Sequence, residues 1–309
     1  MKVLFTQDIG VDRKFIDNEL IDNNLIPDWS IADGLEVNNP DEVVCICTAS
    51  MPLLKETLAK YKNLRIISMS FTGFDHVDKE YCIKNDIKVY NVPSYSTDSV
   101  AELAIGLAIS LLRMIPLGDS EMRNGNWNEN IQGFELANKT CGIIGTGAIG
   151  LRLAELLAVF KCNLKAWSRT KKDKFISLGG LYTDLDLIFK ECDIVFITIA
   201  LNDETENLIS MKQLDKMKNT SYLINVARGP IINKIDLIHC LKNNQIGGVG
   251  LDVYDSEPLP EYDELRQMQK TVLTPHVAYR TEEALERKAK VTVENILNGL
   301  DGITKNKVL

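Results

Sequence analysis

The segment TCGIIGTGAIG at residues 140–150 is the feature that most restricts the fold. A short apolar run leads into the pattern Gly145-x-Gly147-x-x-Gly150, and an apolar-periodic segment typical of a helix follows. Gly145 would permit a sharp turn, Gly147 would let a pyrophosphate approach the backbone, and Gly150 would let the helix pack closely on the strand. The phosphates would then lie at the helix N-terminus. The order strand, turn and helix therefore predicts a βαβ unit that binds a dinucleotide.

Strands and helices alternate along the rest of the chain. Strands are predicted at residues 2–6, 43–48, 65–69, 88–92, 163–167, 193–199, 222–226, 247–253 and 271–274. Helices are predicted at residues 12–18, 52–61, 78–85, 100–112, 151–160, 211–217, 234–241 and 281–297. This alternation favours an α/β fold with parallel sheets covered on both faces, whose ligand crevice lies at the carboxyl ends of the strands.

Length and composition restrict the class of protein further. A chain of 309 residues is too long for one ordinary core, so two domains are expected. The net charge of −8 argues against a nucleic-acid surface and against binding to anionic membrane. The seven cysteines are odd in number and scattered, which is typical of reduced thiols and favours a cytoplasmic location. We expect no signal peptide, no membrane span and no metal site.

The three histidines differ in their sequence context. His239 lies within a predicted helix and is expected on a helix face, while His76 lies in a polar loop and is expected to be structural. His276 follows the predicted strand 271–274 and a proline, so its ring would project into the crevice. An imidazole titrates near neutrality, which suits a proton donor to a carbonyl oxygen.

Two charged residues also follow predicted strands. Glu257 could pair with an imidazole, stabilise its protonated form and fix its tautomer, although taken alone it is better explained as a solvated loop acid. Arg228 could grip a carboxylate with two parallel hydrogen bonds, although alone it could be a surface residue at a turn. Together with His276 they predict a site that reduces a 2-oxo acid: the arginine holds the carboxylate, the histidine protonates the carbonyl, and a nicotinamide delivers hydride.

Several segments in a fixed order carry a resemblance to a known family. They are VPSYSTDSVAE at 92–102, RNGNW at 123–127, the glycine-rich turn, NVARG at 225–229, GLDVYDSEP at 250–258 and TPHVA at 274–278. Over essentially its whole length the chain resembles the D-isomer-specific 2-hydroxyacid dehydrogenases, and in the segment Ser168-Arg169-Thr170 it is similar to glyoxylate/hydroxypyruvate reductases.

The resemblance implies roles for individual residues. Arg228, Glu257 and His276 match the catalytic trio of the family, and Thr72 and Gly73 match a loop that binds the substrate carboxylate together with Arg228 and His276. The implied cofactor-binding residues are Gly145, Thr146, Gly147, Ala148, Ile149, Gly150, Ser168, Arg169, Thr170, Val226, Ala227, Asp252 at the nicotinamide end, and Thr97.

The resemblance also implies an architecture of two Rossmann-like or flavodoxin-like βα domains. Residues 1–97 and 280–309 would form the substrate-binding (catalytic) domain, and residues 98–279 would form an inserted NAD(P)-binding Rossmann domain. The cleft would close over bound ligand, and family members are commonly homodimers joined through their cofactor domains.

The second strand of the cofactor fold departs from the pattern of many members. Its end reads Trp167-Ser168-Arg169-Thr170, without the aspartate that accepts hydrogen bonds from the adenosine ribose. Because no carboxylate repels a 2′-phosphate, we expect NADP(H) to be preferred over NAD(H). Alternatively, Arg169 stacks on adenine and both cofactors are used. Further along, Ala200 replaces a common proline, and Arg280 either adds positive charge near the substrate mouth or simply begins a helix.

The substrate stays open at this level. Glyoxylate, hydroxypyruvate and pyruvate are the expected 2-oxo acids, and a branched or aromatic acid depends on packing near Met51, Phe71, Phe74 and Tyr95. The alternative from another class is a nicotinamide-sensing binding protein similar to the corepressors that share this fold.

Overall fold

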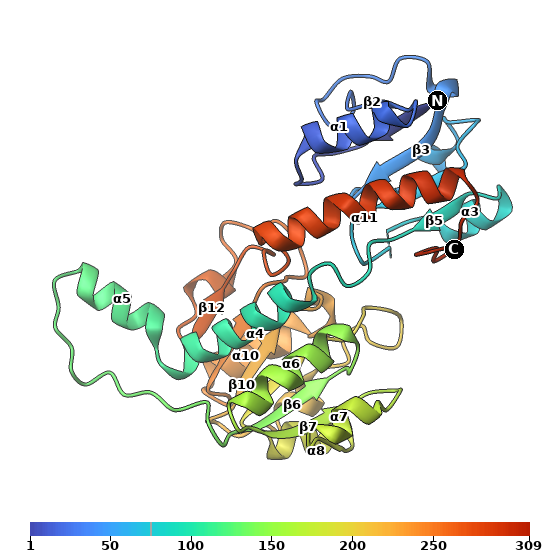
Figure 1. Ribbon diagram of the computed structural model, residues 1–309. Helices are drawn as coiled ribbons and strands as arrows, with labels where there is room; N and C mark the ends of the chain where they lie inside the picture. Colours follow the sequence, from blue (N-terminus) through green and yellow to red (C-terminus); the bar gives the residue numbers. More distant parts are fainter. Residues whose placement is uncertain (75) are drawn as a thin grey trace. The chain divides into compact units, whose positions relative to one another are not determined.

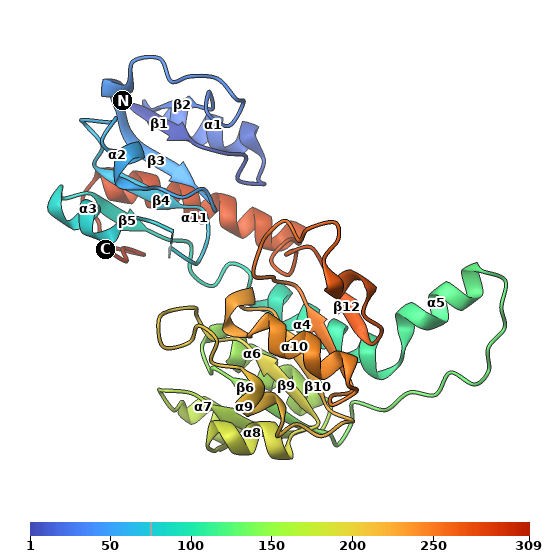
Figure 2. The ribbon, with the colours of Figure 1, turned by 180° about the vertical axis from the view of Figure 1, so that it is seen from behind.

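The computed structural model describes residues 1–74 and 76–309. The chain forms two compact units, one from Met1–Ser96 with Arg280–Leu309 and the other from Thr97–Tyr279 (Figures 1 and 2). Each unit contains one sheet, and every strand pair within the sheets is parallel. The predicted α/β class with two Rossmann-like units is confirmed.

The first unit is a five-stranded sheet with helices on its faces. Its elements are β1 (Lys2–Phe5), α1 (Arg13–Asp22), β2 (Ile26–Asp28), the 3₁₀ helix η1 (Pro40–Glu42), β3 (Val43–Thr48), α2 (Lys55–Leu58), β4 (Ile66–Met69), α3 (Lys79–Lys84), β5 (Lys88–Tyr90) and α11 (Glu282–Leu300). The strand order is β2-β1-β3-β4-β5, the flavodoxin-like arrangement. All six residues of β3 are buried, as expected for the central strand of a parallel sheet.

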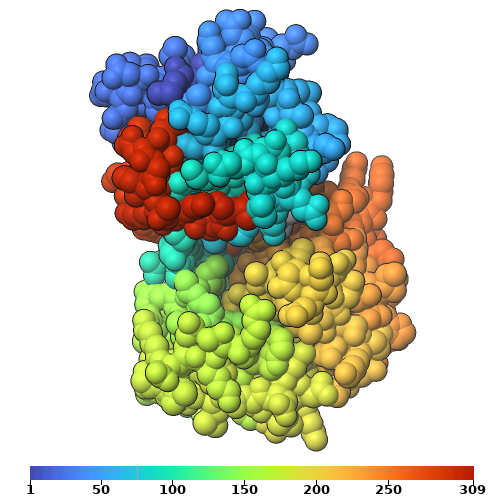
Figure 3. All heavy atoms as spheres, turned by 90° about the vertical axis from the view of Figure 1, so that its right-hand side faces the viewer, coloured from blue at the N-terminus to red at the C-terminus, as the bar shows by residue number. Residues whose placement is uncertain are grey.

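The C-terminal helix α11 completes the first unit although it is far from the N-terminal strands in sequence. Its residues Ala289, Val293 and Ile296 pack into one apolar cluster with β1 and α1. Figure 3 shows this helix, in red, lying against the blue and cyan N-terminal segments of the same unit. The unit is therefore built from both ends of the chain.

The second unit is a seven-stranded sheet. Its elements are α4 (Thr97–Leu112), α5 (Ile115–Arg123), β6 (Thr140–Ile144), α6 (Ala148–Val159), β7 (Asn163–Trp167), α7 (Asp173–Ser177), β8 (Leu181–Tyr182), α8 (Leu185–Glu191), β9 (Ile194–Ile197), α9 (Met211–Leu214), β10 (Tyr222–Asn225), η2 (Gly229–Ile231), α10 (Lys234–Lys242), β11 (Gly248–Leu251), η3 (Glu264–Gln267) and β12 (Thr271–Leu273). The strand order is β12-β11-β10-β9-β6-β7-β8. From β6 the chain adds β7 and β8 on one side and then β9 to β12 on the other side, so the order of the strands switches between β6 and β9. Such a switch point opens a crevice at the carboxyl ends of the strands.

Two apolar cores cover the two faces of this sheet. Helices α4 and α6 contribute to one core, and α8, α9 and α10 contribute to the other. Among the described residues, no single helix is long and apolar enough to cross a membrane, whereas the bent pair α4 and α5 passes that test by length and composition only. Nine residues of α4 are buried inside the second unit, so its apolar character is explained by core packing.

Element boundaries differ from the sequence predictions in several places. The helix predicted at 52–61 is only α2, because Leu54 has extended backbone dihedrals and the helix ends at Leu58. The sequence reasoning missed β2, α5, α7, β8 and α8. Strand β2 has no fully buried residue, and α5 likewise buries none, so neither produces the apolar periodicity on which the predictions rested.

Candidate active site

The glycine-rich turn joins β6 to α6 at the switch point of the second sheet. Gly145 has φ +99, and a Cβ there would lie 2.4 Å from the Ile199 Cγ2 atom of the strand-end segment after β9. A Cβ at Gly150 would lie 2.0 Å from the carbonyl oxygen of Gly145. A larger residue at Gly145 would collide with Ile199, and one at Gly150 would push α6 away from the turn, so both positions require glycine for the fold itself.

Gly147 differs from the other two glycines. A Cβ on it would meet no atom within 4 Å, and its φ of −70 is accessible to any residue. It is the N-cap residue of α6, and no side chain caps this helix end. The first amides of α6, at Ala148 and Ile149, are therefore placed to receive an anion, and the helix dipole favours one.

A cavity of about 350 Å³ adjoins this turn. It is lined by Gly145, Thr146, Gly147, Trp167, Ser168, Arg169, Thr170, Lys172, Thr198, Ile199, Ala200, Asn202, Glu204 and Thr205. The cavity thus brings together most of the residues predicted to bind cofactor from the turn and from the end of β7. Its size is in the range of small-molecule sites.

Thr146 holds the cavity wall together. Its side chain is buried, and its hydroxyl shares a hydrogen bond of 2.8 Å with the Tyr182 hydroxyl, which also accepts from the Lys172 amide at 2.9 Å. On the other side of the turn, the Thr198 hydroxyl donates to the Gly145 carbonyl at 2.7 Å. Sequence reasoning did not single out Lys172, Tyr182 or Thr198, because hydroxyl contacts between distant segments leave no local pattern.

Charges at the mouth of the cavity have opposite signs. The Arg169 guanidinium lies 3.8 Å from the Glu204 carboxylate, and both side chains are more than 80% exposed. Glu204 comes from the loop after β9 and was not predicted from the sequence. An exposed pair of this kind contributes little stability, so Arg169 can exchange this partner for another anion at small cost.

The residues Glu257 and His276 meet beyond the ends of β11 and β12. The Glu257 Oε2 atom lies 2.6 Å from the Nδ1 atom of His276, and Glu257 Oε1 accepts a hydrogen bond of 3.0 Å from the Tyr254 amide. Both side chains are partly exposed, at 28% for His276 and 36% for Glu257. This arrangement fixes the orientation of the imidazole and leaves Nε2 as the ring nitrogen that points away from the carboxylate.

The pKa of Glu257 lies below the ordinary glutamate value. Burial acts to raise this pKa, but the hydrogen bonds from His276 and from the Tyr254 amide, together with the charges of His276 and Arg228, outweigh it. Glu257 therefore stays ionised at neutral pH and stabilises a positive charge on the imidazole. The contribution of Arg228 also shows that its guanidinium is close enough to act on this pair.

Asp252 holds the backbone next to His276. His276 has φ +53, which is uncommon for a residue other than glycine. The following amides, of Val277 and Ala278, each donate at 2.9 Å to the carboxylate of Asp252, which also accepts from the Thr274 hydroxyl at 2.6 Å. The carboxylate is fully buried, and burial raises its pKa despite these hydrogen bonds. Asp252 thus clamps the unusual turn that presents His276.

Arg228 is presented by a second turn, after β10. The Asn225 side chain accepts from the Ala227 amide at 3.0 Å and donates to the Arg228 carbonyl at 2.9 Å, and the Arg228 Nη1 atom donates to the Ala227 carbonyl at 2.7 Å. A Cβ at Gly229 would lie 1.9 Å from the Tyr254 carbonyl carbon. The turn of Arg228 therefore packs directly on the loop that carries Glu257. Asn225 and Gly229 belong to the quoted motif NVARG, but sequence reasoning gave them no role.

The remaining predicted residues are distributed over both units. Val226 and Ala227 lie between β10 and Arg228, and Thr97 is the first residue of α4. Thr72 and Gly73 belong to the first unit, where the Thr72 hydroxyl donates to the Val92 carbonyl at 2.9 Å and the Thr72 carbonyl accepts from Asn91 at 2.7 Å. His239 is exposed on α10, as predicted. Within residues 1–74 and 76–309 no group of three or more His, Cys, Asp or Glu side chains could hold a metal ion.

Comparisons with known proteins found a matching family model and similar relatives. The model of the family described as "D-isomer specific 2-hydroxyacid dehydrogenase, NAD binding domain" matches residues 105–278. A glyoxylate reductase from Thermofilum pendens is 35% identical over 273 residues, which cover 86% of this chain and 80% of that protein.

Two solved structures are similar over the whole chain. A D-lactate dehydrogenase from Aquifex aeolicus, in complex with NAD and lactic acid, has a TM-score of 0.90 and 27% identity, with coverage of 100% of this chain and 99% of that one. An acyclic imino acid reductase in complex with NADPH and D-Arg has a TM-score of 0.89 and 25% identity, with full coverage of both chains. These similar structures thus hold either form of the nicotinamide cofactor.

Proposed function

Because this chain belongs to the D-isomer-specific 2-hydroxyacid dehydrogenase family, we propose that it catalyses the reversible reduction of a small 2-oxo acid to the D-2-hydroxy acid. The family makes it an oxidoreductase with a nicotinamide cofactor. We propose the substrate, the acid–base group and the preferred cofactor from the residues of this chain.

The observation that carries the proposal is the contact of 2.6 Å between His276 and Glu257. In the reduction, His276 gives a proton from Nε2 to the carbonyl oxygen, while the ionised Glu257 stabilises the imidazolium before transfer and holds its orientation. In the oxidation, the same nitrogen takes the proton back. A general acid positioned in this way accelerates such a step by roughly 10²–10⁴-fold.

Arg228 is proposed to bind the substrate carboxylate. Its guanidinium can offer two parallel N–H groups to a planar carboxylate. Its charge also polarises the neighbouring carbonyl as negative charge develops on the oxygen. For Thr72 and Gly73, the proposed contact with the same carboxylate rests on the family resemblance alone.

The residues of the second unit suit a dinucleotide. We propose that the pyrophosphate lies on the amides of Gly147, Ala148 and Ile149, for which the open space at Gly147 and the uncapped end of α6 are the support. When bound, the nicotinamide supplies the hydride. Val226, Ala227, Asp252 and Thr97 are proposed as further contacts by resemblance.

NADP(H) is the proposed preferred form. Residues 168–172 after β7 include no carboxylate, and Ser168, Arg169, Thr170 and Lys172 all line the cavity beside the turn. These groups suit a 2′-phosphate, although Glu204 opposes it from the facing loop. If Arg169 only stacks on adenine, NAD(H) is used comparably well.

Glyoxylate, hydroxypyruvate and pyruvate are the proposed substrates. The support is the name of the glyoxylate reductase relative and the lactic acid bound in the similar lactate dehydrogenase. A branched or aromatic acid would need a wider pocket than these three require.

A homodimer in the cytoplasm is the proposed state of the protein. Helix α5 and the loop after it stand away from the rest of the second unit in Figures 1 and 2. They expose large apolar side chains, with Ile115 50%, Met122 56% and Trp127 76% accessible, which a second copy could cover. All seven cysteines are free thiols, and all except Cys162 are buried, as suits a reducing compartment.

Steady-state kinetics test the proposal. Initial rates with NADPH and NADH would be measured side by side against glyoxylate, hydroxypyruvate, pyruvate and 2-oxoisocaproate. We expect His276→Ala to lower kcat by roughly 10²–10⁴-fold and Arg228→Lys chiefly to raise KM. Rates within a few-fold of the parent for both variants would overturn the assignment of the site.

A further inference from the structure

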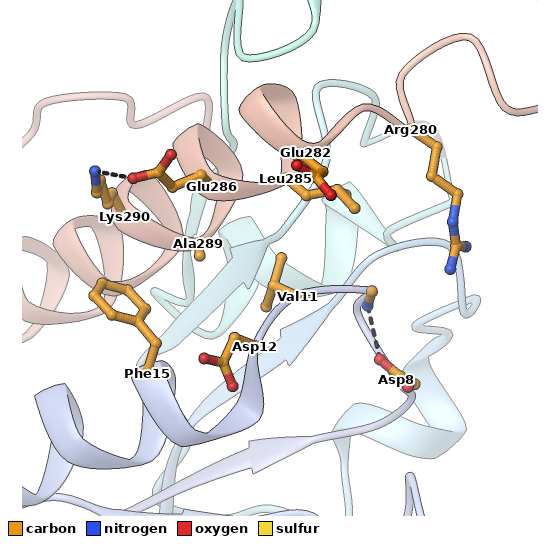
Figure 4. A pocket seen from close by; sticks show the side chains of 11 residues that line it. Asp8, Val11, Asp12, Phe15, Arg280, Glu282, Leu285, Glu286, Ala289 and Lys290 are labelled. Carbon is orange, nitrogen blue, oxygen red and sulfur yellow. Dashed lines mark hydrogen bonds and ion pairs between the residues drawn. The ribbon is translucent and has the colours of Figure 1, made fainter.

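A cavity of about 580 Å³ lies wholly within the first unit, apart from the residues to which the proposed function assigns catalysis. It is formed by the loop after β1, the start of α1, and the first turns of α11. Figure 4 shows its lining side chains. The volume falls in the range of small-molecule sites.

The floor of the cavity is apolar. Val11, Phe15, Leu285 and Ala289 line it, and Val11, Phe15 and Ala289 belong to, or pack against, one apolar cluster of the unit. Val11, Phe15 and Leu285 remain partly exposed to the cavity. A ligand with an apolar chain would cover this surface and remove it from water.

One end of the cavity carries charges of both signs. Arg280, Asp8 and Glu282 line this end, as Figure 4 shows. In the described part of the chain, neither Arg280 nor Glu282 forms a hydrogen bond or an ion pair through its side chain. Asp8 is held in place, because its Oδ1 atom accepts from the Gly10 amide at 2.7 Å in a turn where Gly10 has φ +69. A fixed carboxylate and two uncommitted groups of opposite charge therefore face the same space.

The other charged residues of the lining each have a partner within the unit. Glu286 and Lys290 form an ion pair of 2.7 Å one turn apart on α11. The Asp12 carboxylate caps α1 by accepting from the Lys14 amide at 3.0 Å. Of the two cations that line the cavity, Lys290 is paired with Glu286 and Arg280 forms no ion pair, so a ligand carboxylate would lie at the end with Arg280.

We propose that this cavity binds a free α-amino acid with an apolar side chain. The ligand carboxylate would pair with Arg280, its ammonium with Asp8 and Glu282, and its side chain would cover the floor. A 2-oxo acid lacks the ammonium and would place its carboxylate beside the carboxylates of Asp8 and Glu282, whereas a simple amine would face Arg280 without an anion. The requirement for both charges distinguishes this site from one for the substrate of the proposed reaction.

The experiment is calorimetric titration of L-leucine into the full-length protein without cofactor. We expect saturable one-site binding, and at least about tenfold weaker binding of 4-methylpentanoate and of 3-methylbutylamine, which each lack one of the two charges. Arg280→Gln and Glu282→Gln should each weaken leucine binding about tenfold. Both side chains are exposed, so neither substitution should affect folding.

Two further variants test whether leucine binds in this cavity and not elsewhere on the protein. Glu283→Gln, an exposed neighbour on α11 that does not line the cavity, should bind leucine like the parent. His276→Ala should also bind like the parent, because His276 belongs to the other unit. The proposal would be overturned if leucine showed no saturable binding at concentrations up to roughly 10 mM, which corresponds to very weak affinity. Equal binding of the acid or amine analogue, or loss of binding in His276→Ala, would overturn it as well, and none of these results would bear on the proposed dehydrogenase activity.

Discussion

The Nδ1 atom of His276 and the Oε2 atom of Glu257 lie 2.6 Å apart, although 19 residues separate them in the chain. Each is placed by backbone contacts of its own: the Tyr254 amide holds Glu257, and the carboxylate of Asp252 holds the turn after His276. The pair is therefore preorganised by the fold, and the predictions below test its parts separately.

Replacing Glu257 by Gln should leave the imidazole without a negative partner. We expect kcat for reduction to fall by roughly 10²-fold, because the protonated imidazole is no longer stabilised. KM should change little, since Arg228, the proposed ligand of the substrate carboxylate, is unchanged. Steady-state or stopped-flow rates at saturating cofactor measure the changes in kcat and KM separately. A large rise in KM with unchanged kcat would contradict this prediction.

The Glu257 carboxyl should also make stability depend on pH. Its pKa in the folded chain lies below the ordinary value of 4.5, so the unfolded chain binds its proton more readily. The stability that it contributes is fully present above that ordinary value and is lost as the pH falls through the lower folded pKa. Urea unfolding of the parent and of Glu257→Gln from pH 7 to pH 3.5 should show a constant difference at first, which then shrinks in acid. If the difference in unfolding free energy between the parent and Glu257→Gln grew on acidification, the pKa of Glu257 would be raised in the folded chain and not lowered.

Asp252→Asn should affect catalysis more than folding. Burial raises the pKa of Asp252, so replacing its carboxylate by the neutral asparagine side chain removes a buried charge. However, one of the backbone N–H groups of Val277 and Ala278 then faces the NH₂ group of the asparagine instead of an oxygen acceptor. We expect stability within about 2 kcal/mol of the parent. The activity loss should be larger, because the turn at His276 relaxes. Thr274→Ser, which keeps the hydroxyl that Asp252 accepts from, is the matched control and should behave like the parent.

The glycines of the turn give opposite predictions from the same substitution. Gly150→Ala would place a Cβ 2.0 Å from the Gly145 carbonyl oxygen and should destabilise the protein strongly. Gly147→Ala meets no atom within 4 Å and should leave the unfolding midpoint nearly unchanged. It should instead weaken cofactor binding, because the methyl group occupies the proposed approach of the pyrophosphate. Thermal unfolding and cofactor titration of both variants test these two expectations. Undiminished cofactor affinity in Gly147→Ala would contradict the proposed position of the pyrophosphate.

The positions of these glycines were predictable because their roles are local. The sequence also predicted the parallel α/β class, since long buried runs such as residues 43–48 show it directly. Arg228, Glu257 and His276 were found because each follows a strand, and parallel strands bring their carboxyl ends to one edge. Their proposed roles followed from the chemistry of guanidinium, carboxylate and imidazole, and the resemblance matched the same three residues to the catalytic trio of the family.

Features that depend on contacts between distant segments were not predictable. Glu204 faces Arg169 from a loop 35 residues away, and no pattern in either segment indicates the pairing. The clamp by Asp252 acts through backbone amides 25 and 26 residues away, which carry no residue-type signal. Helix α5 was missed because it buries no residue and so lacks a core-facing periodicity.

Glu204 should limit the proposed preference for NADPH. It lies 3.8 Å from Arg169 and would repel a 2′-phosphate at the same place. We expect Glu204→Gln to raise the ratio of kcat/KM for NADPH over NADH several-fold, and Arg169→Ala to lower it by about tenfold. Glu206→Gln, an exposed acid in the same loop that does not line the cavity, is the control. Equal ratios in all three variants would favour the stacking role of Arg169.

Lys288 provides a test of buried charge in the first unit. Its side chain is buried. The Nζ atom donates to the Ile9 carbonyl and lies 5.9 Å from the centre of the Tyr95 ring. Burial lowers its pKa to about 8 from 10.5, with Arg280 acting in the same direction and Cys47 and Asp8 in the opposite one. Between these two pH values the unfolded chain binds the proton more tightly than the folded chain, so folding becomes more favourable as the pH rises.

The parent should therefore gain stability relative to Lys288→Met between pH 7 and pH 10, by at most about 3 kcal/mol. Comparing the two proteins at each pH cancels the titration of the tyrosines and thiols that they share. Lys290→Met, an exposed lysine on the same helix, should show a nearly flat difference. A parent that instead loses stability relative to Lys288→Met over this range would mean that the ammonium is better satisfied in the folded chain than in water. The hydrogen bond to Ile9 would then outweigh the cost of burying the charge.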